Sequence, residues 1–398
     1  MTSAETAYEP KLRDTPFPLM QVGTIFRNMS EKVDPHLYEP LSVGQLGVTP
    51  QLKGVAQQEG NGEKKLVRPG QIAMNSRSDR RGASGLSEYE GVVSVVYTVL
   101  QPDLNYIYPR FAHHLFRSVD FQNEYYRWGT GIVDDLWSTK FERLAQIRIP
   151  LPDLETQRRI ADYLDKEIGE MDALIEEFEG LVRNLQARKP MLIDNLLAGF
   201  PVAALALSWK VVDCLHITAP FIGSGENYLV SIEQLGSENL TLDGANRTDG
   251  ETFSKLREGE RKPSPGDVIM SRNASVGKSS IVKESDPPIA LGQDVVIFKN
   301  NDKNDSRLLY YFLQSNALMR TVEMNTVGST LKRINVGSIK SLPYPVLALE
   351  KQQLIAEQLQ RETAKMDALI EESTRLIENL KARKTALITE VVTGRKEV

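Results

Sequence analysis

The heptapeptide Met-Asp-Ala-Leu-Ile-Glu-Glu occurs at residues 171–177 and again, letter for letter, at residues 366–372. It lies inside a longer repeat: residues 154–199 align without a gap with residues 349–394 at a constant offset of 195, and 23 of the 46 paired positions are identical. Chance would match only about one position in seventeen. The chain therefore consists of two copies of one unit.

The repeat continues more weakly outside this block. Pro69 and Gly70 return as Pro265 and Gly266, and each pair precedes a short apolar run that predicts a strand after a turn. Between such landmarks the two halves diverge freely. The sequence therefore indicates one scaffold that presents two different surfaces.

Each copy of the long block predicts a helix with a coiled-coil seam, because its apolar residues recur at spacings of four and three. The seams comprise Leu164, Ile168, Met171, Ile175, Phe178, Val182, Leu185, Leu192 and Leu196 in the first copy, and Leu359, Met366, Ile370, Ile377, Leu380, Leu387 and Val391 in the second. If a two-fold axis relates the copies, as in most duplicated assemblies, the helices run antiparallel. We expect an α+β fold of two globular domains separated by two long helices, which form an antiparallel coiled coil with pseudo-two-fold symmetry.

The repeat also suggests domain boundaries. We expect a first globular domain at residues 1–150, a first helix at 151–199, a second globular domain at 200–345 and a second helix at 346–398. A chain of 398 residues that is 41% hydrophobic can bury two such cores. The single cysteine, Cys214, excludes a disulfide framework, and the four histidines lack zinc-site spacing. No stretch approaches the ~20 apolar residues of a membrane span, so we expect a cytoplasmic protein.

Each long helix is entered through the same short motif. Pro150 precedes Leu154, Glu155 and Gln157, and Pro345 precedes Leu349, Glu350 and Gln352. Together with the Met-Asp-x-Leu-Ile core and the segment at residues 328–345, this motif resembles the specificity subunit of type I restriction-modification systems over nearly the whole chain. The resemblance implies that each globular domain is a target recognition domain for one half of a split double-stranded DNA sequence. It also implies that the helices set the gap between the halves and bind two methyltransferase subunits, to which restriction and motor subunits attach.

Two loops carry residue types that bind base edges and phosphates. Each follows a repeated Pro-Gly strand, and the candidate DNA-binding residues are Asn75, Ser76, Arg77, Arg80 and Arg81 in the first half and Ser271, Arg272, Asn273 and Lys278 in the second. Further candidates for phosphate contacts are Arg127, Lys140, Lys332 and Arg333. For these four single charges a solvated surface is an equally good explanation. Because the net charge is −5, DNA binding requires the basic residues to gather on one face.

Both long helices share a charge layout. Acidic pairs in the middle are followed by basic pairs, namely Glu176, Glu177, Arg188 and Lys189 in the first helix and Glu371, Glu372, Arg383 and Lys384 in the second. Such a run is usually a solvated helix face. Its recurrence also fits a second interpretation, a docking surface used twice by identical partners.

Two short motifs imitate catalytic sites without completing them. Residues 277–279 match the end of a phosphate-binding loop, but Arg272 occupies the position of its first glycine. Residues 286–288 match the start of an amino-methyltransferase motif, but Ile289 cannot stack on a flipped base. We therefore expect no catalytic residue, no metal site and no cofactor in this chain. The alternative hypotheses are a self-sufficient DNA-modifying enzyme and a coiled-coil scaffold that does not bind DNA.

Overall fold

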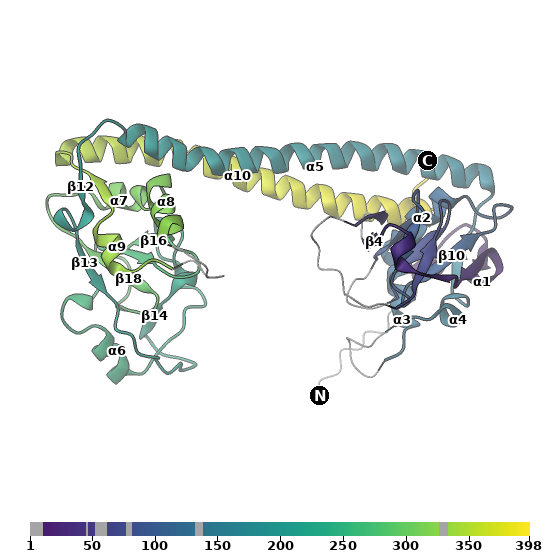
Figure 1. Ribbon diagram of the computed structural model, residues 1–398, viewed down its shortest axis with the longest axis horizontal. Coiled ribbons are helices and arrows are strands. Elements are labelled where there is room, and N and C mark those ends of the chain that lie inside the picture. The colour runs from purple at the N-terminus through teal and green to yellow at the C-terminus, as the bar shows by residue number, and fades with distance from the viewer. Residues whose placement is uncertain (1–10, 45–46, 52–61, 77–81, 132–137, 326–332) are drawn as a thin grey trace. The chain divides into compact units, whose positions relative to one another are not determined.

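The computed structural model describes residues 11–44, 47–51, 62–76, 82–131, 138–325 and 333–398 (Figure 1). It divides into two compact units: unit 1 comprises residues 1–178 and 375–398, and unit 2 comprises residues 179–374. The boundary falls inside both long helices, α5 (Leu154–Leu197) and α10 (Leu349–Val392). Each unit therefore contains one globular part and a segment of both helices.

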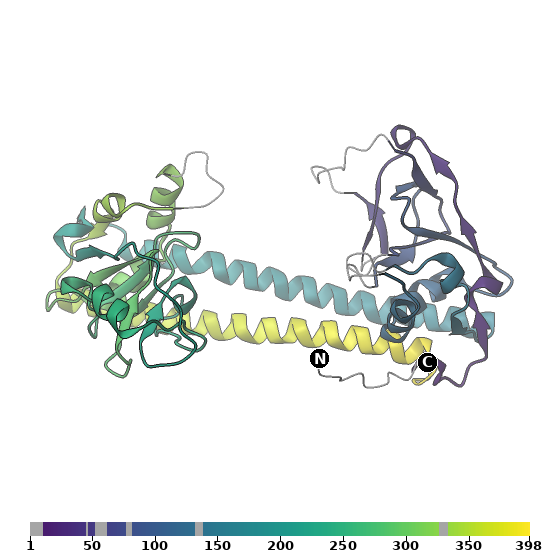
Figure 2. The ribbon, with the colours of Figure 1, turned by 90° about the horizontal axis from the view of Figure 1, so that it is seen from below.

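Within each unit the two helical segments run antiparallel. In unit 1, Leu164 near the start of α5 shares a core with Val391 at the end of α10. In unit 2, Ile193 near the end of α5 shares a core with Ile355 near the start of α10. All predicted seam residues are buried or half-buried, and Figure 2 shows the helical segments side by side. The predicted antiparallel pairing is confirmed.

One interhelical ion pair occurs twice, once in each unit. Lys384 Nζ lies 2.6 Å from Asp172 Oδ1 in unit 1, and Lys189 Nζ lies 2.5 Å from Asp367 Oδ1 in unit 2. The offset of 195 maps Asp172 onto Asp367 and Lys189 onto Lys384, so these are equivalent contacts. Each unit therefore contains the same interhelical side-chain contact.

Reversing one charge of this pair should destabilise the helix pairing only modestly. We expect Lys384→Asp to lower the free energy of unfolding by about 1 kcal/mol, since partly exposed ion pairs contribute roughly 0.2–1 kcal/mol. The double variant Asp172→Lys, Lys384→Asp should recover most of that loss. Urea unfolding of the single and double variants measures it, and a double variant as unstable as the sum of its parts would contradict the pairing.

The globular part of unit 1 is built on a four-stranded antiparallel sheet in the order β2-β10-β7-β8. Smaller sheets pair β3-β6-β9, β4-β5 and β1-β11. The strands are β1 (Leu19–Gln21), β2 (Phe26–Met29), β3 (Lys32–Val33), β4 (Leu41–Gly44), β5 (Gly47–Pro50), β6 (Lys64–Val67), β7 (Ile72–Met74), β8 (Ser84–Leu86), β9 (Gly91–Val93), β10 (Thr98–Pro102) and β11 (Arg148–Pro150). The helices are α1 (Val22–Ile25), α2 (Pro109–Arg117), α3 (Val119–Arg127) and α4 (Phe141–Leu144).

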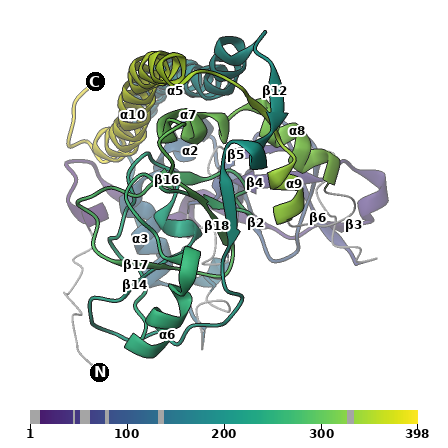
Figure 3. The same cartoon turned by 90° about the vertical axis from the view of Figure 1, so that its left-hand side faces the viewer.

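Unit 2 repeats this plan with the sheet β13-β18-β15-β16. A parallel pair β14-β17 and an antiparallel pair β12-β19 complete it. The strands are β12 (Val202–Ala204), β13 (Lys210–Asp213), β14 (Tyr228–Val230), β15 (Val268–Ser271), β16 (Ser279–Ile281), β17 (Ile289–Leu291), β18 (Val295–Lys299) and β19 (Pro343–Pro345). The helices are α6 (Gly250–Leu256), α7 (Ser306–Phe312), α8 (Asn316–Asn325) and α9 (Val336–Lys340). In Figure 3, α7 lies between the long helices and the sheet, and α6 lies beyond β14 and β17.

The repeated Pro-Gly landmarks are turns before the buried central strands. Gly70 and Gly266 have φ values of +87° and +82°, a region that a residue with a side chain adopts only with strain. The strands that follow, β7 and β15, are buried along their whole length. The predicted strands and the mixed α+β class are therefore confirmed.

The glutamine of each helix-entry motif fastens its globular part to its long helix. Gln157 Oε1 accepts from the backbone N–H of Tyr108 (2.8 Å), just before α2, and Gln352 Oε1 accepts from that of Asp305 (3.0 Å), just before α7. Both glutamines are buried. In both units the same side chain thus holds the globular part against its long helix. No helix in the described part of the chain is long and apolar enough to cross a membrane.

Candidate nucleic-acid interface

The predicted loop of unit 1 starts directly after β7. Asn75 and Ser76 are both buried: the N–H of Asn75 donates to the carbonyl of Ala83 (2.8 Å), and the Ser76 hydroxyl donates to the carbonyl of Val96. These two residues therefore hold the base of the loop. Arg77, Arg80 and Arg81 lie outside the described residues.

A second segment is tied to this loop. The backbone N–H of Thr139 donates to the carbonyl of Ser76 at 3.1 Å. Thr139 is itself buried and donates through its hydroxyl to the carbonyl of Tyr125 (2.7 Å). The next residue, Lys140, is exposed. The structure thus brings Lys140 next to the base of the Asn75–Ser76 loop.

Unit 2 has the equivalent hydrogen bond. The N–H of Ile334 donates to the carbonyl of Arg272 at 2.9 Å, and Asn273 forms an antiparallel bridge with the exposed Arg333. Ser76 corresponds to Arg272, and Thr139 to Ile334, in the repeat. Two groups of predicted residues that are distant in sequence are therefore neighbours in both units. Lys332 lies outside the described residues.

The loop of unit 2 closes on itself. The N–H of Ser271 donates to the carbonyl of Lys278 (2.8 Å), and the Ser271 hydroxyl donates to that of Asn273 (2.9 Å). Ala274 has a φ of +55°, so the chain turns sharply there. Lys278 is exposed, and its alkyl chain lies beside Gly236. Ser271 and Arg272 are buried, which suits a supporting role in the loop.

A group of potential metal ligands lies beside Arg272. Among the described residues, one ligand atom each of Asp213, Cys214 and His216 lies within 4.8 Å of the others. However, Arg272 Nη2 lies 2.9 Å from His216 Nε2 and 3.4 Å from Asp213 Oδ1. This guanidinium already supplies the positive charge, so the set does not fit a cation.

Arg127 is engaged in an ion pair inside unit 1. Its guanidinium binds both carboxylate oxygens of the buried Glu124, at 2.9 and 2.6 Å. The Trp128 indole N–H donates to the same carboxylate at 2.9 Å. The pKa of Glu124 stays below its usual value, since these hydrogen bonds and the charge of Arg127 outweigh the opposing effect of burial. Arg127 remains half exposed, and its contact with DNA stays a prediction.

The candidate partner-binding residues lie on the long helices as predicted from the repeat. Glu176, Glu177, Arg188, Glu371, Glu372 and Arg383 are exposed, and Lys189 and Lys384 are half-buried in the interhelical ion pairs. The exposed leucines Leu174 and Leu369 occupy equivalent positions three residues before Glu177 and Glu372, and so lie on the same helix face as these two acidic residues. Each helix therefore presents the same mixed apolar and acidic patch.

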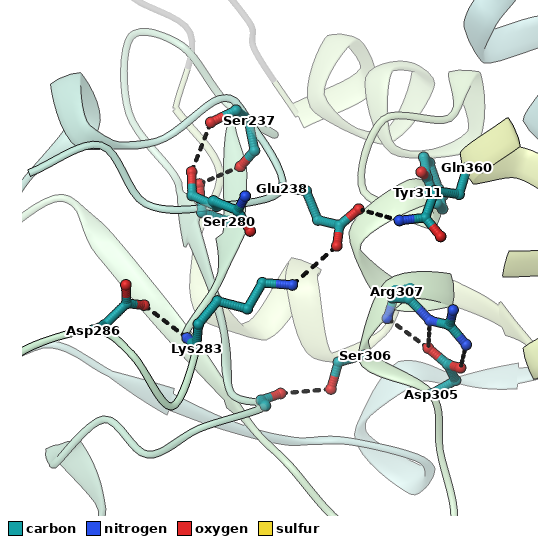
Figure 4. Close-up of polar contacts among 12 residues, drawn as sticks. Ser237, Glu238, Ser280, Lys283, Asp286, Asp305, Ser306, Arg307, Tyr311 and Gln360 are labelled. Carbon is teal, nitrogen blue, oxygen red and sulfur yellow. Dashed lines mark hydrogen bonds and ion pairs between the residues drawn. The ribbon is translucent and has the colours of Figure 1, made fainter. Parts of the chain in front are cut away.

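The contact between globular part and helix differs between the units at one repeat position. In unit 2, Glu238 accepts from Lys283 Nζ (3.0 Å) and from Gln360 Nε2 of α10 (3.3 Å), as Figure 4 shows. In unit 1, Asp165 of α5 corresponds to Gln360, and His114 Nε2 of α2 lies 2.8 Å from its Oδ1. The scaffold thus accepts different polar pairs at this junction.

Acidification should destabilise unit 1 through the neighbouring His113. Burial lowers the pKa of His113 to about 3. Below the ordinary pKa of about 6.5 the unfolded chain takes up a proton that folded His113 does not bind, so stability is lost as the pH falls from about 6.5 toward 3. We expect His113→Gln to weaken this pH dependence by at most about 1.4 kcal/mol per pH unit.

Urea unfolding at pH 7.5 and 5.5 measures this effect. The matched control is His36→Gln, because His36 is exposed. His114, whose pKa is also lowered by burial, leaves some dependence in the His113 variant. An unchanged pH dependence after His113→Gln would contradict the expectation.

Sequence reasoning missed three residues of this interface. Thr139 connects the two segments of unit 1 through its backbone, and any residue type can make such a bond. Asp213 and His216 meet Arg272 only because β13 and β15 flank β18 in the sheet. The signal that the sequence offered was the similar spacing of these segments in the two halves, 63 residues from Ser76 to Thr139 and 62 from Arg272 to Ile334.

Comparisons with known proteins agree on one family. Residues 218–379 match the family model described as "Type I restriction modification DNA specificity domain". The specificity subunit of the type I restriction enzyme MjaVIII of Methanocaldococcus jannaschii is 27% identical over 273 residues, which cover 63% of this chain and 63% of that protein. The putative MjaX specificity subunit of the same organism is 24% identical over 324 residues, with 75% and 71% covered.

Solved structures support the fold. A chain from a study of the assembly and conformational transition of the type I restriction-modification system superposes with a TM-score of 0.69 at 17% identity, covering 95% of this chain and 98% of that chain. The HsdS subunit from Thermoanaerobacter tengcongensis gives 0.53 at 16% identity, covering 99% and 100%. This chain therefore shares its fold with these proteins.

Proposed function

We propose that this chain, which belongs to the specificity subunits of type I restriction-modification systems, recognises an asymmetric bipartite sequence in double-stranded DNA. Each globular part binds one half of the target through the loop after its central Pro-Gly strand. The residues assigned to recognition of the first half are Asn75, Ser76, Arg77, Arg80, Arg81, Arg127 and Lys140. Those assigned to the second half are Ser271, Arg272, Asn273, Lys278, Lys332 and Arg333.

The repeated backbone hydrogen bond carries this proposal. This bond runs from Thr139 to Ser76 in unit 1 and from Ile334 to Arg272 in unit 2. In each unit it brings a polar loop next to a cationic segment at the equivalent place. Such a combination of short polar and basic side chains suits base edges flanked by phosphates. Because the two loops differ in sequence, the two half-sites differ, and the target is asymmetric.

The partners follow from the helices. The equivalent patches around Leu174 with Glu177 and around Leu369 with Glu372 suit two copies of one partner, the methyltransferase subunit, with restriction and motor subunits attached to it. Catalysis belongs to these partners. We keep the domain boundaries expected from the repeat. Residues 1–150 and 200–345 recognise the two half-sites, and residues 151–199 and 346–398, which contain α5 and α10, set the gap between them.

Exposed cations of the interface should contribute to affinity without base selectivity. We expect Arg333→Ala and Lys140→Ala each to weaken binding of the full chain to all duplexes and to reduce the slope of log affinity against log salt by about 1, as for one lost phosphate contact. Lys255→Ala in α6, which removes an exposed lysine elsewhere in unit 2, is the control. Selection from a random duplex pool, followed by salt titrations, measures both quantities.

Two results would replace the proposal. Cleavage or methylation of DNA by the purified chain alone would support a self-sufficient enzyme. Absence of any selected sequence, with and without a methyltransferase partner, would support a scaffold that does not bind DNA.

A further inference from the structure

Arg272 is held at the base of the unit 2 loop. It is 4% exposed, its N–H donates to the carbonyl of Asp294, and its own carbonyl accepts from Ile334, both at 2.9 Å. Its Nη2 lies 2.9 Å from His216 Nε2 and 3.4 Å from Asp213 Oδ1. These partners are more exposed than Arg272, so they cover its guanidinium from the solvent.

The sheet brings these groups together. Asp213 is the last residue of β13 and pairs with Val296 of β18, while Ser271 of β15 pairs with Val295 of the same strand. The side chains of Asp213 and Arg272 therefore meet across the end of β18. Asn273, the next residue of the loop, follows immediately.

Stability of the fold does not explain a buried arginine at this position. A buried ion pair is often no more stabilising than packed apolar side chains, and Arg272 Nε has no hydrogen-bond partner among the described residues. In unit 1 the equivalent Ser76 is uncharged, and its hydroxyl donates to the carbonyl of Val96. The shared scaffold therefore does not require an arginine here, and Arg272 belongs to what distinguishes the two halves.

We propose that Arg272 is a positioning residue. It holds the unit 2 loop in the conformation that selects the bases of the second half-site, and it does not itself touch DNA. The inference rests on the proposed function and deepens it. A phosphate contact would require Arg272 to leave Asp213 and His216, whereas Lys278 and Arg333 are already exposed. The buried guanidinium instead fixes the path of residues 273–278 and of the segment that starts at Arg333.

The test uses the full chain and a consensus sequence selected from random duplexes. Affinities are measured for duplexes with single-base changes in either half of that consensus. We expect Arg272→Met and Asp213→Asn each to lower discrimination in one half-site by about tenfold, the effect of one mismatched base pair. Discrimination in the other half and the salt slope should not change, and Arg272→Lys, which keeps the charge beside Asp213, should restore part of the loss.

Arg307→Met on α7 is the matched control, because it removes an ion pair with Asp305, the residue before α7 in the same unit, whose side chain is 8% exposed. It should leave discrimination in both halves unchanged, and thermal unfolding monitors the fold of every variant. If Arg272 touches a phosphate, Arg272→Met reduces the salt slope while Asp213→Asn does not weaken binding, and the proposal is overturned. Unchanged discrimination in folded Arg272→Met also overturns it. Failure of the unmodified chain to select any sequence would instead refute the proposed function, and this inference with it.

Discussion

Replacing Gln157 by alanine should lower the free energy of unfolding of unit 1 by about 3 kcal/mol or more, because buried polar groups left without partners cost roughly 1–3 kcal/mol each. Gln157 is fully buried. Its Oε1 accepts from the N–H of Tyr108 at 2.8 Å, and its Nε2 donates to the carbonyls of Tyr106 (2.9 Å) and Pro152 (2.8 Å). The substitution therefore leaves three backbone groups unpaired at once, in addition to a cavity.

The same substitution at Gln352 should destabilise unit 2 instead. Gln352 accepts from the N–H of Asp305 and donates to the carbonyl of Leu347 at 2.9 Å and to Asn304 Oδ1 at 3.1 Å. Urea unfolding shows whether the unfolding transition of unit 1 or that of unit 2 moves to lower urea concentration. Gln360→Ala is the control, because Gln360 is exposed on α10 and makes a single bond of 3.3 Å.

A charge change at this position makes a sharper test. Gln157→Glu keeps the shape and the bond from Tyr108 but turns a carboxylate oxygen toward two carbonyls. We expect a loss at neutral pH at least as large as that of the alanine variant, which diminishes as the pH falls toward the ordinary glutamate pKa of about 4.3. If Gln157→Ala lowers the free energy of unfolding by less than about 0.5 kcal/mol, water molecules replace the hydrogen bonds of Gln157 and the expectation is wrong.

The long helices could be predicted from the sequence because their signal is local and repeated. The repeat predicted helices at 151–199 and 346–398, and α5 and α10 run from Leu154 to Leu197 and from Leu349 to Val392. The turns at Gly70 and Gly266 were equally readable, since their residue types report a backbone conformation.

Other features could not be predicted, for physical reasons. The division into units depends on cores such as the one that includes both Leu164 and Val391, residues of two helices far apart in sequence. The bond from Thr139 to Ser76 uses backbone atoms only, so no residue type reports it. Burial of Arg272 depends on strand order, and composition alone made it resemble an exposed DNA contact.

Breaking the ion pair between Asp267 and Lys299 should destabilise unit 2 by about 3–5 kcal/mol, because removal of Asp267 leaves the Lys299 ammonium, whose side chain is only 20% exposed, without its carboxylate partner. Asp267 is 1% exposed and forms an ion pair with Lys299 Nζ. Its carboxylate also accepts from the N–H groups of Ser264 (2.8 Å) and Asn300 (2.7 Å). We expect Asp267→Ala to produce the full loss, measured by urea unfolding.

Unit 1 shows how the same site is filled without charge. Gln71 and Gln101 occupy the positions of Asp267 and Lys299, and the Nε2 of Gln71 donates to Gln101 Oε1 at 3.1 Å. Gln71 Oε1 accepts from the N–H of Arg68 at 2.9 Å, as Asp267 accepts from that of Ser264. The double variant Asp267→Gln, Lys299→Gln copies this pair into unit 2. It should recover most of the stability that Asp267→Gln alone loses, since removing both charges avoids the unpaired one. A double variant no more stable than Asp267→Gln would mean that the strands around the two sites are not interchangeable, although their order is the same.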